Sequence, residues 1–127
     1  MPIDRSKWKE ELKARLTSGV AASEVDIQAG WRDLVCDLLD RIDSLGVPYQ
    51  IFEIKERYGG LQLHLETDVP SKAIEDLIEE AEYRSWRICE QCGGVGSETV
   101  SGEWMRTLCN PCFKMWDEES WRGRLTP

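Results

Sequence analysis

The sequence predicts an α+β fold in which two N-terminal helices, a β-hairpin and a third helix pack onto a four-cysteine zinc module. Three observations support this prediction. Apolar residues recur at the helical period over residues 31–45 and 74–81, two alternating runs flank Gly59-Gly60, and four of the five cysteines form two close pairs near the C-terminus. We therefore expect a helical and hairpin domain over residues 1–88 and a zinc-binding module with a C-terminal helix over residues 89–127.

The composition predicts a small acidic protein of the cytoplasm. A chain of 127 residues is near the usual size of one domain, and its formal net charge is −8. No apolar run approaches the about 20 residues that a membrane helix needs, and the charged N-terminus has no signal-peptide h-region. We expect no membrane association and reduced thiols. The negative field is expected to repel phosphate backbones and to attract basic surfaces.

Helical periodicity is strongest in the second predicted helix. A narrow apolar stripe predicts a short first helix over residues 5–17, and Ser23 with Asp26 predicts a capping box before the second. The opposite face of the second helix carries four acids: Asp33, Asp37, Asp40 and Asp43. Cys36 falls toward that face. The aspartates form either a solvated surface or a partner-binding strip.

The two alternating runs predict a hairpin whose two-residue turn is Gly59-Gly60. With Tyr58 opposite Leu61, one face collects the apolar side chains of Phe52, Ile54, Tyr58, Leu61, Leu63 and Leu65. Glu56 falls among them, so either the register has a bulge or its carboxylate meets a buried partner. Ser71 then caps a third helix that runs to about Trp86, directly before the first cysteine pair.

The spacing C-x2-C-x16-C-x2-C predicts one structural zinc ion held by Cys89, Cys92, Cys109 and Cys112. A two-residue gap lets both sulfurs of a pair reach one ion, and four thiolates leave no open position for a catalytic water. Iron is the alternative metal, and a redox dithiol is the alternative use of one pair. Residues 95–108 are expected to form a small hairpin, and Cys36 is expected to stay outside the site.

Two resemblances accompany these motifs. Residues 89–115, with C-E-Q-C-G, a central Trp104 and L-C-N-P-C-F-K-M, resemble the GATA-type zinc finger of the treble-clef group. That resemblance implies a local fold, because treble clefs serve many functions. A GATA-type finger grips DNA with basic residues, whereas this hairpin offers only Arg106 and three acids in a row follow in the helix. Residues 30–112 also resemble a recurrent group of small bacterial and bacteriophage proteins, which implies a bacterial or phage origin.

The expected function is stoichiometric binding to another protein, as an inhibitor, immunity protein or adaptor. Its target would present a basic surface, as a nucleic-acid-processing enzyme does. We expect the partner to contact the C-terminal region and the hairpin patch, through Trp116, Trp121, Asp117, Glu118, Glu119, Lys55, Arg57 and Tyr58. Trp116 and Trp121 lie five residues apart, so one helix face cannot hide both.

Two other function classes stay open. A zinc-finger regulator could bind nucleic acid through the basic first helix or through Arg122 and Arg124. An enzyme could use the polar patch at the hairpin, which could also hold a small anionic ligand. The lone histidine, His64, and the lack of a phosphate loop or nucleophile motif lead us to expect no enzyme.

Overall fold

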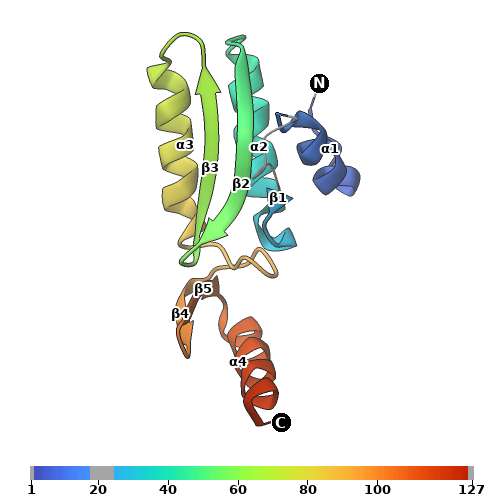
Figure 1. Cartoon of the computed structure of the whole chain (residues 1–127), viewed down its shortest axis with the longest axis vertical. Coiled ribbons are helices and arrows are strands. Elements are labelled where there is room, and N and C mark those ends of the chain that lie inside the picture. The colour runs from blue at the N-terminus through green and yellow to red at the C-terminus, as the bar shows by residue number, and fades with distance from the viewer. Residues whose placement is uncertain (1, 18–24, 126–127) are drawn as a thin grey trace.

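The computed structural model describes residues 2–17 and 25–125, the last six of these by their backbone alone (Figure 1). The α+β prediction is confirmed: the described residues form four α-helices, a three-stranded sheet in the order β1-β2-β3 and a two-stranded sheet of β4 and β5. The helices are α1 (Trp8–Arg15), α2 (Arg32–Ser44), α3 (Lys72–Ser85) and α4 (Asn110–Leu125), with 3-10 turns at Arg5–Lys7 and Ala29–Trp31. The strands are β1 (Val25–Asp26), β2 (Tyr49–Arg57), β3 (Gly60–Thr67), β4 (Ser97–Ser101) and β5 (Trp104–Leu108).

The main core lies between the β2–β3 hairpin and helices α2 and α3, which run along the strands in Figure 1. The helical repeat of α2 buries one broad stripe: Leu34, Val35, Cys36, Leu38, Leu39 and Ile42. Opposite it, Ile51, Ile54, Leu61 and Leu63 are buried on the hairpin. None of the helices over the described residues is both long and apolar enough to cross a membrane.

The aspartates of α2 hold the N-terminal segment. Arg5 pairs with Asp33 at 3.0 Å and with Asp37, and Arg15 pairs with Asp43 at 2.7 Å. Because this segment lies over α2, the expected exposure of Cys36 is wrong: its side chain is fully buried. Burial raises the pKa of the Cys36 thiol to about 11.

Only Asp26 of the predicted capping box before α2 lies among the described residues, and it does not cap the helix. Asp26 lies in β1, where it pairs with Lys55 of β2, and Ser23 lies outside the described residues. Asp26 therefore belongs to a strand, and α2 begins at the N-cap residue Trp31 with no side-chain cap hydrogen bond. The chain enters α2 through the 3-10 turn that starts after Gln28.

The turn of the hairpin is Tyr58-Gly59, one residue earlier than predicted. Both residues have positive φ, 54° and 84°, and Arg57 pairs with Gly60 to close the turn. Two consecutive positive φ values are typical of the two-residue hairpin turn whose backbone twist matches that of the flanking strands. Gly60 instead serves a close approach, because a Cβ there would lie 2.5 Å from the Trp86 ring. Tyr58, predicted on the apolar face, is exposed.

A register shift between Ile51 and Glu53 accounts for a second difference. It turns Phe52 away from the core, and its ring stacks on His64 with centroids 5.2 Å apart. Glu56 lies opposite Leu61 on the core side, at the end of the sheet. Its carboxylate accepts a hydrogen bond from the Gly59 backbone N–H at 2.7 Å, so this acid stabilises the turn.

Candidate metal centre

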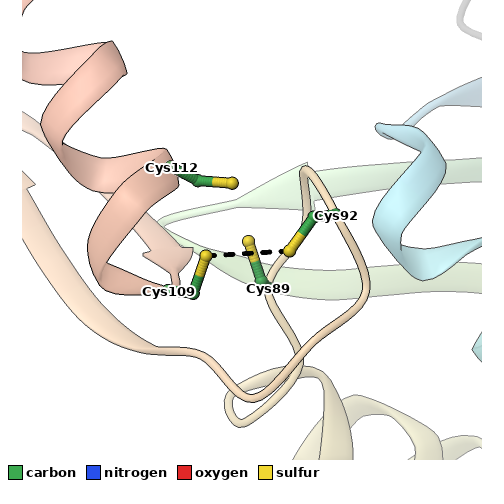
Figure 2. A group of neighbouring side chains, drawn as sticks. All are labelled: Cys89, Cys92, Cys109 and Cys112. Atoms are coloured by element: carbon green, nitrogen blue, oxygen red, sulfur yellow. Dashed lines mark hydrogen bonds between the residues drawn. The ribbon is translucent and has the colours of Figure 1, made fainter.

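The four predicted cysteines meet at one point between the knuckle and the start of α4 (Figure 2). Cys89 and Cys92 follow α3, Cys109 follows β5, and Cys112 lies in the first turn of α4. All four Sγ atoms lie within 4.8 Å of one another, and those of Cys92 and Cys109 are 3.6 Å apart. A tetrahedral ion with metal–sulfur bonds of about 2.3 Å requires sulfurs about 3.8 Å apart. The cluster therefore has the dimensions to bind one metal ion. The fully buried Cys36 of α2 is not part of it.

Local backbone geometry forms the knuckle. The N–H of Gly93 donates to the Cys89 carbonyl at 2.9 Å, and the N–H of Cys89 donates to the Gly94 carbonyl at 2.8 Å. Gly93 has a φ of 85°, which closes the turn after Cys92. At the second pair, the N–H of Phe113 donates to the Cys109 carbonyl at 2.9 Å as the helix begins.

The electrostatics of the cluster favour a cation. Burial opposes ionisation of Cys89, but backbone N–H groups of Cys92, Cys109 and Gln91 outweigh it and lower its pKa to about 7. The neighbouring Cys109 sulfur raises the pKa of Cys112 to about 12. Four thiols in this volume cannot all ionise without a positive charge between them, so metal binding would release their protons.

A buried carboxylate joins the knuckle to the small hairpin. Glu90 accepts hydrogen bonds from Nε of Arg106 at 2.6 Å and from the backbone N–H of Thr107 at 3.3 Å. Burial raises the pKa of Glu90, and Arg106 opposes that shift. The ion pair is 20% exposed on the arginine side and 4% on the glutamate side. These contacts join the knuckle to β5 in addition to the sulfur cluster.

Backbone contacts also fix the knuckle on the α/β layer, which the sequence did not indicate. The Gly30 N–H donates to the Glu90 carbonyl and the indole N–H of Trp31 donates to the Ile88 carbonyl, both at 2.9 Å. A Cβ on Gly30 would lie 2.1 Å from the Cys89 carbonyl oxygen. The glycine in the turn that precedes α2 was the only sequence signal of this approach.

Of the predicted partner-binding residues in α4, some have partners within the chain. Trp116 is half-buried, with the Arg106 guanidinium 5.3 Å from its ring centroid and Phe113 edge-on at 6.2 Å. Asp117 accepts a hydrogen bond from the Ser101 hydroxyl at 2.7 Å. Glu118 and Glu119 are exposed. The side chains of Trp121, Arg122 and Arg124 lie outside the described residues.

The predicted hairpin residues lie close to the metal module. Lys55 is half-buried and pairs with Glu53 at 3.3 Å, whereas Arg57 and Tyr58 are exposed. The next residue, Gly59, abuts β5: its carbonyl accepts a hydrogen bond from the Thr107 hydroxyl at 2.6 Å. The hairpin turn therefore contacts β5 directly, although the two segments lie far apart in the sequence.

Comparisons with known protein families, with curated proteins and with solved structures gave no match. The function of the chain therefore has to be inferred from its own residues. What the geometry establishes is an α+β fold that carries a four-cysteine cluster able to hold one metal ion.

Proposed function

We propose that this chain is a zinc-binding protein that acts by stoichiometric binding to another protein with a basic surface. The observation that carries the proposal is the apolar surface of the metal module, residues 89–119. Its most exposed large apolar side chains are Val95 at 88%, Trp104 at 74%, Met115 at 64% and Val100 at 55%. An exposed tryptophan on a rigid frame is the kind of residue that dominates interface energy.

Zinc is the metal that these ligands suit best. Four sulfur donors at tetrahedral spacing saturate the ion, which leaves it a structural role. The order of knuckle, hairpin and helix is the order found in treble clefs, which supports the resemblance of residues 89–115. Iron with four thiolates would absorb visible light, so a colourless protein with one equivalent of zinc would exclude it.

Charge favours a basic partner at this module. The whole zinc module, residues 89–127, contains six carboxylates and four basic side chains, and one of those four, Arg106, is already paired with Glu90. Four thiolates around a divalent ion add about two further negative charges. Such a surface attracts lysines and arginines and steers a basic protein toward the exposed apolar residues.

We assign no catalytic step to the chain, and its lone histidine gives no reason to do so. His64 has ordinary partners, since its ring stacks on Phe52 and its Nε2 lies 3.6 Å from a Glu66 carboxylate oxygen. A histidine in these surroundings needs no catalytic explanation.

The test is quantitative binding to purified candidate partners. Proteins captured on the immobilised zinc-loaded chain would be identified, purified and titrated by calorimetry. We expect a one-to-one complex with a basic protein that Trp104→Ala weakens by at least about 30-fold, the range of an interface hot spot. Val69→Ala, at an exposed apolar residue between β3 and α3, is the matched control and should bind normally. Equal affinity of the two variants, or no one-to-one complex with any purified candidate, would contradict the proposal.

A further inference from the structure

A second exposed cluster, here called the junction patch, consists of Arg57, Tyr58, Tyr83, Trp86 and Arg87. It lies where the β2–β3 turn meets the end of α3. Arg57 is paired across the hairpin with Gly60, and the Trp86 ring lies against Gly60. Tyr83 lies in the last turn of α3, Trp86 is the C-cap residue of that helix, and Arg87 follows it. The contact of Trp86 with Gly60 thus brings residues from two distant parts of the sequence to one surface.

The three aromatic rings of the patch are open to solvent yet held in place. Tyr58 is 66% exposed, Tyr83 is 59% exposed and Trp86 is 40% exposed. The Arg57 guanidinium lies 5.4 Å from the Tyr58 ring centroid, and that of Arg87 lies 4.4 Å from the Tyr83 centroid. Arg87 also donates to the Tyr83 hydroxyl at 2.6 Å. Each tyrosine ring therefore carries a cation on one face, and much of the remaining ring surface is free.

Several carboxylates near the patch in the chain are turned inward or paired, whereas Glu79 and Glu80, one turn before Tyr83 in α3, are exposed. Glu56 accepts from the Gly59 N–H, and Glu53 pairs with Lys55. Glu82 is half-buried, and burial raises its pKa. The exposed charges of the patch itself are the two arginines. A chain with a net charge of −8 thus presents a local surface of cations and stacking rings.

We propose that the junction patch binds a short single-stranded segment of nucleic acid, about two or three nucleotides, with bases stacked on the rings. Arg57 and Arg87 would contact the phosphates beside the stacked bases. An acidic peptide could pair with the arginines but would leave the ring faces without planar partners. Duplex DNA is not a ligand, because its bases are already stacked and the overall charge repels it. This site is separate from the apolar residues of the metal module and does not depend on the proposed protein partner.

The test is fluorescence anisotropy with a labelled 12-nucleotide oligo(dT) or oligo(U) and the zinc-loaded full chain. We expect saturable binding at low salt, with a log–log salt slope of about −1.4 for two phosphate contacts. The same sequence as a duplex, a free mononucleotide and a glutamate-rich peptide are the competitors. Displacement by the peptide would overturn the proposal in favour of an acidic protein segment. Equal affinity for the mononucleotide or the duplex would overturn it as well.

Matched variants locate the site. Tyr83→Ala should weaken oligonucleotide binding by at least about fivefold, since loss of one stacking platform has effects of this size. Arg57→Ala should also weaken binding, and it should make the salt slope less steep by about 0.7 because one phosphate contact is lost. Trp104→Ala and Arg41→Ala remove an exposed aromatic and an exposed arginine elsewhere, and both should bind oligonucleotide normally. The site would be overturned by an equal loss of oligonucleotide affinity in all four variants or by unchanged affinity in all four. The absence of saturable oligonucleotide binding would also overturn it. Trp104→Ala tests the protein partner, whereas Tyr83→Ala and Arg57→Ala test the junction patch. The two proposals can therefore fail separately.

Discussion

At Gly30 and Gly60 there is no room for a Cβ, because other parts of the chain lie against these two residues. At Gly30 the neighbour is the carbonyl backbone of the metal knuckle, and at Gly60 it is the indole ring of Trp86. Neither glycine has a positive φ, so conformational freedom does not explain them. Each one instead allows two elements to approach more closely than a Cβ permits.

We predict that Gly30→Ala destabilises the protein and weakens its metal site together. The new Cβ would lie 2.1 Å from the Cys89 carbonyl oxygen, so the knuckle or the start of α2 must move. Overpacking of this kind costs about 1–3 kcal/mol of unfolding free energy, here at the upper end. Urea denaturation and competition with a chromophoric chelator measure the two effects.

Gly46→Ala is the control for that substitution. Gly46 has a φ of 70° and no atom within 4 Å of its Cβ position, so alanine there costs stability through backbone strain alone. Its zinc affinity should match that of the unmodified chain. A Gly30→Ala protein with unchanged zinc affinity would show that the knuckle does not depend on this contact.

Cys36 is a buried thiol outside the four-cysteine cluster, and we predict that it stays unmodified in the folded protein. Its pKa of about 11, raised by burial, leaves almost no thiolate at pH 8. The neutral thiol favours the folded state below the ordinary thiol pKa of 9.0, and this contribution is lost as the pH rises toward 11.

Alkylation followed by peptide mass spectrometry checks the prediction for Cys36. Iodoacetamide should label the knuckle cysteines after chelation and label Cys36 only after unfolding. Cys36→Ser should keep one zinc per chain, while burial of the hydroxyl should cost about 1–3 kcal/mol of stability. Labelling of Cys36 before the other cysteines, or loss of zinc from Cys36→Ser, would argue against this assignment.

At the scale of elements, the β2–β3 hairpin shows how packing chooses among turns that a sequence allows. The alternating pattern of both strands is compatible with turns at 58–59 and at 59–60. The Trp86 ring decides between them, because it requires a glycine at the first residue of β3. Tyr58 is the result, a non-glycine residue with positive φ.

We predict opposite effects at Tyr58 and Gly60. Asparagine tolerates positive φ better than tyrosine does, so Tyr58→Asn should leave stability unchanged or raise it by about 0.5–1 kcal/mol. Gly60→Ala should lower the free energy of unfolding by about 2 kcal/mol or more, because a Cβ would overlap the Trp86 ring. Thermal and urea unfolding of the two variants measure these changes. Unchanged stability of Gly60→Ala, or clear destabilisation by Tyr58→Asn, would contradict these assignments.

At the scale of the whole molecule, the metal module is continuous with the α/β layer through backbone hydrogen bonds. Gly30 and Trp31 donate to Glu90 and Ile88, and Thr107 donates to Gly59. Binding energy at the four sulfurs can therefore stabilise the start of α2, which is remote in the sequence.

We predict that chelation of zinc increases amide hydrogen exchange at residues 30–34 as well as in the knuckle. Without the ion, the carbonyls of Ile88 and Glu90 are no longer held in place to accept from Trp31 and Gly30. Amides in the middle of β3, at Leu63–Leu65, serve as the control and should keep their protection. Unchanged exchange at residues 30–34 would show two independent units, with a boundary near residue 88.

The amino-acid sequence by itself determined the features that depend on near neighbours. The period of apolar residues predicted α2, α3 and the hairpin strands. Ser71 was predicted to cap α3, and its hydroxyl accepts a hydrogen bond from the Ile74 N–H at 3.3 Å. The two C-x-x-C pairs predicted which four sulfurs meet. A helical face, a cap and a knuckle each involve residues a few positions apart, so local patterns carry them.

Only the tertiary structure decided the features that depend on contacts between distant segments. The N-terminal segment buries Cys36, the Trp86 ring moves the hairpin turn by one residue, and the knuckle explains Gly30. The same is true of the junction patch, whose members come from β2 and from the end of α3. Sequence periodicity predicts that a face will be buried, but it does not predict which segment packs against that face. Many distant segments are equally apolar, and only the fit of their side chains decides between them.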